Sequence, residues 1–448
     1  MALTQVKSFK RKLQDLCDNY NASPLGTEHY FNPREIWKKM TGYLSDHAAD
    51  QKKVFRELAK YHSECDLELR GEAAMEDPSM ELDVEEIFEE KKEAMLAEIG
   101  GVDGWMRCSV EERLRLGKKL VRDAEIFLGE RVLERLPPEQ RQEAAGCFWS
   151  GCGMHKDLNA VKEGAGRMSL WWEKSGSVPP VTLANKVRAE AGSDCEVRRS
   201  DRGGVKLTNL LGALVRHKDP KRGQQDRFRT FCRRALGYEV AFPDTSNTRY
   251  QCYTSASAEI LCNGDLYLDF LTFIATTKTS NPGELNHMEE NIRRGLTDRS
   301  TLTEIVILAL YGEVVGGPFA QFLRSSGDRN GLDLGPDYDR FKRHIQHLIS
   351  HPGLLISQNI DSAVCSLDGR PWRNPNGIRK IEQVYPNHPD LEGALVAFLQ
   401  GALDKLESFT EEFKEGSPIS KATPEERWRA FRRPTNDLNE GSLGLLRC

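Results

Sequence analysis

The sequence has no regular cysteine framework and no long hydrophobic run. Its eleven cysteines are scattered from Cys17 to Cys448, and an odd number at irregular spacing in a large chain is typical of free thiols in a reducing compartment. The most apolar run, TLTEIVILALYGEVVGG, is interrupted by Glu304 and Glu313, well short of the ~18 apolar residues of a membrane span. We therefore expect a nuclear or cytoplasmic protein with no membrane partner.

The sequence also lacks a secretory leader, an internal repeat and a low-complexity tract. The first residues, MALTQVKSFKRKLQ, place charged side chains where a signal peptide has its apolar segment, so we expect no secretion. What is present is a polar chain, with 29% charged and 39% hydrophobic residues among 448. That length is typical of two or three domains.

Helical patterns dominate the chain. Asn32 and Pro33 have the residue types of a helix cap and a first helical position, and residues 109–136 have helical spacing up to the prolines at 137 and 138. Strand-like pieces are few and short, and two of them are residues 266–274 and 354–360. The prediction is an α-rich α/β fold.

Two charged blocks lie within a chain whose net charge is −5. Residues 72–98 contain 11 acids and two lysines, a composition that favours a solvated linker or an exposed helix. Residues 197–234 contain 12 Lys or Arg and three Asp, a net charge of +9 over 38 residues. This basic block contains Phe228 and Phe231. It could bind the phosphates of a DNA backbone while the two aromatic rings stack on bases. Alternatively, it forms a basic helix face that balances acidic regions elsewhere in the chain.

Under the DNA hypothesis the phosphate contacts come from the lysines and arginines of the basic block. These candidate DNA-binding residues are Arg198, Arg199, Arg216, Lys218, Lys221, Arg222, Arg227, Arg229, Arg233 and Arg234.

Three short segments contain candidate site residues, and each has a simpler structural interpretation. Asp46 in LSDHAADQKK follows an apolar stretch and precedes a helix, so it suits a metal-binding carboxylate or an ordinary helix cap. Cys152 and His155 in CGMHK have the spacing of two metal ligands, but no second pair completes a zinc site, and a packed cysteine with a hydrogen-bonded histidine is favoured. Asp437 and Glu440 have the spacing of a capping box.

Taken together, five segments resemble conserved blocks of transposase-like proteins abundant in fungal genomes. The segments are LSDHAADQKK, GCGMHKDLNAVKEG, FPDTSNTRYQCY, LNHMEENI with TLTEIVILALYG, and PTNDLNEGSLG. They are similar to the KDZ (Kyakuja-Dileera-Zisupton) group and, more distantly, to hAT and Mutator-like transposases. They run in order from about residue 37 to residue 444, and GCGMHKDLN and TNDLNEG are the most specific of them.

The resemblance implies an RNase H-like catalytic core with a large helical insertion, an Asp-Asp-Glu triad and a Cys-x-x-His motif. Residue by residue, Asp46 matches the second acid, with Asp50 as the alternative, and Glu440 matches the third. Cys152 and His155 match the Cys-x-x-His motif. The domains implied are 1–168 for the first part of a partial core, 169–412 for the insertion and 413–448 for the return to the core.

In such enzymes the three carboxylates bind two Mg²⁺ ions that activate a nucleophile and stabilise the leaving oxygen of a phosphodiester. If this chain is active, Asp46 and Glu440 are its catalytic and metal-binding residues. No candidate for the first acid precedes Asp46, since Asp15 and Asp18 lie in a predicted helix. We therefore expect a transposon-derived DNA-binding protein without cleavage activity. The alternatives are a non-enzymatic helical scaffold and a small zinc domain around Cys147, Cys152 and His155.

Overall fold

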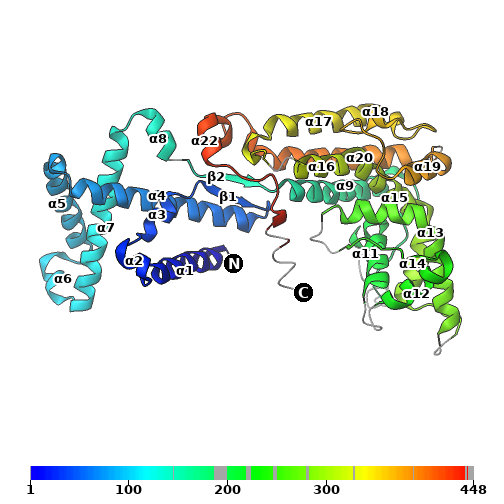
Figure 1. The fold of residues 1–448 in the computed structure, drawn as a ribbon, viewed down its shortest axis with the longest axis horizontal. Coiled ribbons are helices and arrows are strands. Elements are labelled where there is room, and N and C mark those ends of the chain that lie inside the picture. Colours follow the sequence, from blue (N-terminus) through cyan, green and yellow to red (C-terminus); the bar gives the residue numbers. More distant parts are fainter. Residues whose placement is uncertain are drawn as a thin grey trace. The chain divides into compact units, whose positions relative to one another are not determined.

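The computed structural model describes residues 2–144, 146–185, 199–217, 223–245, 250–278, 282–325, 328–386, 388–438 and 441. Contacts divide the chain into two compact units, which are described separately below. Unit 1 comprises Met1–Ser150 and Glu415–Arg432, and unit 2 comprises Gly151–Lys414 and Arg433–Cys448. Figure 1 shows the ribbon coloured along the sequence, and most of it is helical. The expectation of an α-rich fold is confirmed.

Unit 1 consists of helices and one strand pair. Its main elements are α1 (Ala2–Asn21), α2 (Pro24–Glu28), α3 (Pro33–Lys38), β1 (Gly42–Ser45), α4 (Ala49–Met75), η1 (Pro78–Met80), α5 (Glu81–Glu98), α6 (Gly101–Arg107), α7 (Val110–Arg135), α8 (Pro138–Ala144), β2 (Phe148–Gly151), α21 (Pro418–Lys421) and α22 (Pro424–Arg429). The last residue of β2, Gly151, is the first of unit 2.

The long helices α4 and α7 pack closely because glycines stand at their contact. A Cβ atom at Gly71 of α4 would lie 1.9 Å from the carbonyl oxygen of Glu125, and one at Gly129 of α7 would lie 2.1 Å from that of Leu67. The acidic segment, residues 72–98, covers the end of α4, η1 and the whole of α5. Helix α5 places Ile87 in a small core with Leu128 of α7. The exposed-helix interpretation of the acidic segment is confirmed, apart from that buried stripe.

The strand pair of unit 1 is joined to the later part of the chain by Arg432. This guanidinium, 8% exposed, donates hydrogen bonds to the carbonyl oxygens of Phe148 at 2.7 Å and Thr41 at 2.5 Å. Gly42 leaves room for it, since a Cβ there would lie 2.2 Å from the guanidinium. Among the described residues only β1 and β2 form a sheet, so an RNase H-like core stays a prediction.

Unit 2 is an assembly of helices. Its main elements are α9 (Gly153–Ser175), η3 (Arg199–Asp201), α11 (Gly203–Arg216), α12 (Gln225–Leu236), α13 (Cys252–Thr277), α14 (His287–Thr297), α15 (Arg299–Tyr311), the π-helix η4 (Gly312–Gly316), α16 (Gly317–Ser325), η5 (Gly331–Asp333), α17 (Gly335–Ser350), η6 (Pro352–Leu354), α18 (Ser362–Cys365), α19 (Pro375–Val384), α20 (Leu391–Phe409) and η7 (Glu411–Phe413).

The core of unit 2 is built around α15, which packs against α11, α13 and α20. Figure 1 shows α9 and α20 side by side in this unit, and they are antiparallel because Lys156 contacts the carbonyl of Phe409 while Trp171 packs over Gly393. The continuous helix Arg299–Ser325 is long and apolar enough to cross a membrane, and 78% of its most apolar window is buried inside the structure.

Most predicted elements agree with the structure, but both predicted strands are wrong. Asn32 caps α3 with Pro33 in its first turn, and the helix expected over residues 109–136 is α7, which Ser109 caps. Residues 266–274, predicted as a strand, are instead the second half of helix α13. Residues 354–360 are the end of η6 and an irregular loop that follows it. The predicted domains 1–168, 169–412 and 413–448 describe a core that is interrupted by an insertion. The division of the chain into two compact units does not test that prediction.

Candidate functional site

The Cys-x-x-His motif lies at the start of helix α9. The chain passes directly from β2 through Cys152 into α9, and Gly153 is the first helical residue. The backbone nitrogen of Gly153 donates a 3.0 Å hydrogen bond to the carbonyl oxygen of Pro434. Any larger residue at this position would displace a neighbour, because a Cβ there would lie 2.5 Å from Leu323. Cys152 thus precedes the first turn of α9, and His155 lies within that turn.

Four polar side chains from three distant segments meet beside this helix start. The thiol of Cys152 donates to the amide oxygen of Asn436 at 3.0 Å. The hydroxyl of Tyr250 donates to the same oxygen at 2.7 Å and lies 3.3 Å from Nδ1 of His155. The rings of His155 and Tyr250 pack edge to face, with centroids 5.1 Å apart. We call these four residues the polar cluster.

Burial determines the chemical state of the cysteine in the polar cluster. Cys152 is 0% exposed, and burial raises the pKa of its thiol above the usual value. A neutral thiol is a hydrogen-bond donor and a poor nucleophile. Cys152 therefore links α9 to Asn436 through its S–H group.

The segment with the expected third acid is adjacent to the polar cluster. Asp437, which follows Asn436, accepts a 3.0 Å ion-pair contact from Nε of Arg324 on α16. Glu440 lies outside the described residues, so its expected role as an acid or as the end of a capping box stays a prediction.

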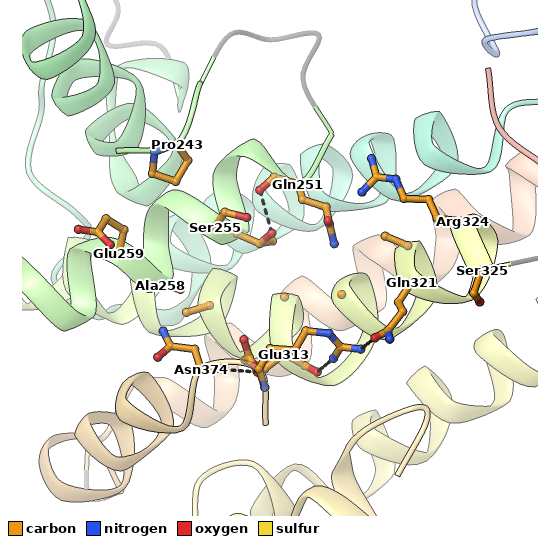
Figure 2. A pocket seen from close by; sticks show the side chains of 16 residues that line it. Pro243, Gln251, Ser255, Ala258, Glu259, Glu313, Gln321, Arg324, Ser325 and Asn374 are labelled. Carbon is orange, nitrogen blue, oxygen red and sulfur yellow. Dashed lines mark hydrogen bonds between the residues drawn. The ribbon is translucent and has the colours of Figure 1, made fainter. Parts of the chain in front are cut away.

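A cavity of about 700 Å³ lies next to this region in unit 2. Figure 2 shows its walls: Gln251, Ser255 and Glu259 come from the start of α13, Glu313 from η4, and Gln321 and Arg324 from α16. Arg324 is the residue that also contacts Asp437, and Gln251 directly follows Tyr250 of the polar cluster. The cavity and the polar cluster are thus built from neighbouring residues.

Two irregular pieces of backbone form part of the cavity wall. Gln251 has φ +57°, and it is the one residue other than glycine with positive φ among those described. Its side-chain amide donates 3.0 Å to the carbonyl of Gly316, the last residue of the π-helix η4. Strained residues and single π-turns are both enriched at functional sites, so the cavity is a candidate ligand site.

One side of the cavity is held by Glu313. Its carboxylate accepts hydrogen bonds from the backbone nitrogens of Arg373 at 2.9 Å and Asn374 at 3.2 Å. The Arg373 guanidinium donates to Gln321 at 2.9 Å, which connects this loop to α16. The lining therefore offers amide, hydroxyl, carboxylate and guanidinium groups, a mixture suited to a polar ligand.

The other expected catalytic acid, Asp46, lies in unit 1 directly after β1. Its carboxylate accepts a 3.1 Å hydrogen bond from the backbone nitrogen of Ala48, at the start of α4. The position at the end of a strand agrees with the expectation. The N-cap of α4 is Ala48, with no side-chain cap hydrogen bond, so Asp46 is not the residue that caps this helix. Asp50, the second candidate, lies in the first turn of α4.

The metal site expected at Asp46 and Glu440 stays a prediction, since Glu440 lies outside the described residues. No group of three or more His, Cys, Asp or Glu side chains with metal-binding geometry occurs in the described part of the chain. Asp46 has no described carboxylate partner for a two-metal site, and Cys152 uses its thiol as a donor to Asn436. We derive no metal-dependent step from this arrangement.

The basic block is only partly visible. Arg198, Lys218, Lys221 and Arg222 lie outside the described residues, as does the side chain of Arg199. On α12, Arg229 and Arg233 pair with Glu239, and Arg234 is exposed.

Two further arginines among the candidate DNA-binding residues make neutral contacts. Arg216 donates to the carbonyl of Phe242 at 2.9 Å, and Arg227 donates to Thr277. Both guanidinium groups thus remain available as charges next to the surface of unit 2.

Stacking on bases, one of the two alternatives for the aromatic residues of the basic block, is wrong for Phe228. Its ring is 1% exposed and packs against Tyr267 and Phe270, with centroids 5.5 and 5.0 Å away. Phe231 is partly buried against the same core. The aromatic residues of the basic block therefore anchor α12 on α13, and any DNA contact there depends on the charges.

Sequence reasoning missed Tyr250, Asn436 and the cavity. Tyr250 and Asn436 both lie in segments that carry the transposase resemblance, FPDTSNTRYQCY and PTNDLNEGSLG. Their membership of these segments is the feature of the sequence that could have identified them as site residues. Tyr250 is 186 positions from Asn436, so spacing gave no indication that they meet. Comparison with family models, curated proteins and solved structures finds no match to this chain.

Proposed function

We propose that this chain is a transposon-derived DNA-binding protein, similar to KDZ transposases, whose catalytic set is incomplete. The observation that supports the proposal most is the polar cluster. Three of the five segments that carry the resemblance supply Cys152 and His155, Tyr250, and Asn436. Segments that contribute to one functional site are expected to lie close together in the folded protein. Residues of these three segments are in contact although they are 95 to 284 positions apart in the sequence.

Under this proposal the strand pair, α4 and the start of α9 belong to a partial RNase H-like core, and most of residues 169–412 to its helical insertion. Asp46 and Glu440 are the remaining acids of the ancestral site. With no candidate for the first acid, the expected activity is binding of DNA without cleavage. The expected location is the nucleus or the cytoplasm.

The surface of unit 2 supports the DNA-binding half of the proposal through its arginines. Arg229 and Arg233 pair with Glu239, but these arginines are 47% and 64% exposed, and exposed ion pairs contribute roughly 0–1 kcal/mol. A phosphate can therefore replace Glu239 as their partner. Arg234 lies on the same helix, so α12 can present three guanidinium groups to a nucleic-acid backbone.

The test is a titration of duplex DNA over a range of salt concentrations. Binding through phosphates weakens as salt rises, and each lost contact lowers the slope of log affinity against log salt by about 1. Replacing Arg229, Arg233 and Arg234 together by Ala should reduce the slope by about 3. Arg379→Ala, an exposed arginine of α19, is the matched control and should leave it unchanged.

Two results would overturn the proposal. An absence of binding at low salt would favour the non-enzymatic scaffold, whose charged blocks serve protein contacts. Strong Mg²⁺- or Mn²⁺-dependent cleavage of DNA that Glu440→Gln abolishes would show that the catalytic set is complete.

A further inference from the structure

Helix α7 has an apolar stripe that is buried at one end and open at the other. The stripe repeats at helical spacing and consists of Val110, Leu114, Gly117, Val121, Ala124 and Leu128. Ala124 and Leu128 are 0% exposed and pack in the small core with Ile87. Val110, Leu114 and Val121 are 84%, 61% and 41% exposed. Thus the stripe continues beyond the helices that cover it.

Helix α6 also has exposed apolar side chains, and its end contacts the start of α7. Arg113 of α7 donates hydrogen bonds to the carbonyls of Trp105 at 3.1 Å and Met106 at 2.8 Å, which hold the end of α6 against α7. Met106 and Val102 of α6 are themselves 67% and 63% exposed. Large exposed apolar patches are typical of interaction sites.

We propose that this stripe is the contact between two copies of the chain, with the two α7 helices antiparallel about a two-fold axis. An axis between Leu114 and Gly117 sets Val110 of one copy opposite Val121 of the other, and Leu114 opposite Gly117. Gly117 suits the centre of such a contact because a Cβ there would meet nothing within 4 Å. Its small size lets the two backbones approach closely.

Charge complementarity identifies a second copy as the occupant. Glu111 and Lys118 are seven positions apart and lie on the same side of the stripe. A two-fold axis brings the same side of both helices together, so Glu111 of each copy comes within reach of Lys118 of the other. Both side chains are exposed, and neither has an ion-pair partner among the described residues.

The stripe itself is tested by the mass of the full chain in sedimentation over a range of concentrations. The wild type should show a monomer–dimer equilibrium, and Leu114→Asp should be monomeric with an unchanged helical circular dichroism spectrum. Leu82→Asp is the matched control, since Leu82 is 82% exposed on α5 and lies outside the stripe. A wild type that stays monomeric at every concentration would overturn the proposal.

The antiparallel register is tested by exchanging charges. Glu111→Lys and Lys118→Glu should each raise the dimer dissociation constant about tenfold, since each removes two exposed ion pairs and opposes like charges. The double exchange should restore the wild-type value, while Glu112→Lys, on another side of α7, should change it little. A dimer that does not respond to the single exchanges, or that the double exchange fails to restore, would exclude this contact.

Discussion

The Cys152 thiol and the Asn436 amide oxygen are joined by a 3.0 Å hydrogen bond across 284 positions of sequence. That oxygen also accepts the hydroxyl of Tyr250, so one amide group satisfies two donors from different segments. Since Cys152 is buried, loss of the acceptor would remove a hydrogen bond that water cannot replace. The polar cluster is therefore a structural link between α9 and the segment after Arg432.

Asn436→Leu should destabilise unit 2 by about 1–3 kcal/mol, because it removes the shared acceptor while keeping a side chain of similar size. Urea denaturation of the full chain, followed by tryptophan fluorescence, measures the loss. Asn19→Leu on the exposed face of α1 is the control and should have little effect. Equal stability of both variants would show that the polar cluster does not hold the segment in place.

Removing one partner of the buried ion pair Lys156–Glu412 should lower the unfolding free energy strongly. The two side chains are 0% and 7% exposed, and Lys156 Nζ also donates to the carbonyl of Phe409 at 2.6 Å. Lys156→Met leaves the Glu412 carboxylate buried without its cation, and we expect a loss of about 3–5 kcal/mol in unfolding free energy.

A double-mutant cycle separates this effect from simple loss of packing. Lys156→Met combined with Glu412→Gln should cost clearly less than the sum of the single changes, because no charge is then left buried alone. If the two losses simply add, the pair does not couple as the geometry indicates.

The elements that the sequence predicted correctly are mostly recognisable from residues that are adjacent in the chain. Asn32 with Pro33 and Ser109 are helix starts whose side chains accept the hydrogen bonds expected of caps. The strand prediction for residues 266–274 is wrong because the aromatic and branched residues outweighed the spacing. Tyr267, Phe270, Leu271 and Ile274 are the buried positions, and their i, i+3, i+4, i+7 spacing is helical.

The candidate site was less predictable because it depends on contacts between distant segments. Cys152 and His155 could be identified as a motif, but a spacing of 95 residues to Tyr250 carries no information about contact. The burial of Phe228 was hidden for the same reason. Its neighbours in sequence are arginines, whereas its neighbours in space are Tyr267 and Phe270 of α13.

Glu304 should make the protein less stable as pH rises. The carboxyl group is 4% exposed and accepts hydrogen bonds from Trp172 and from the backbone of Gly204 at 3.0 and 2.7 Å. Burial nevertheless raises its pKa from 4.5 to about 7. Between these values the unfolded chain loses the proton that the folded chain keeps, so stability falls from pH 4.5 to about pH 7.

Glu304→Gln isolates that contribution. The variant keeps the acceptor oxygen and lacks the titrating proton, so the difference in unfolding free energy between variant and wild type should change in favour of the variant as pH rises through this range. Asp157, whose pKa burial raises to about 6, is present in both proteins and cancels in the difference. A difference that is constant between pH 4.5 and 8 would contradict the assignment.

Arg432 should hold the strand pair of unit 1 together. Burial lowers the pKa of its guanidinium to about 10, so the group is still protonated at neutral pH and donates to the carbonyls of Phe148 and Thr41. Hydrogen bonds from a charged donor contribute about 1.5–3 kcal/mol each.

Arg432→Met should therefore speed amide hydrogen exchange in residues 42–45 and 148–150, while Arg433→Met, at an exposed position, should not. Lysine should restore protection only in part, because a single ammonium group lacks the fork that reaches two carbonyls at once. Full protection in Arg432→Met would mean that pairing between the strands alone suffices.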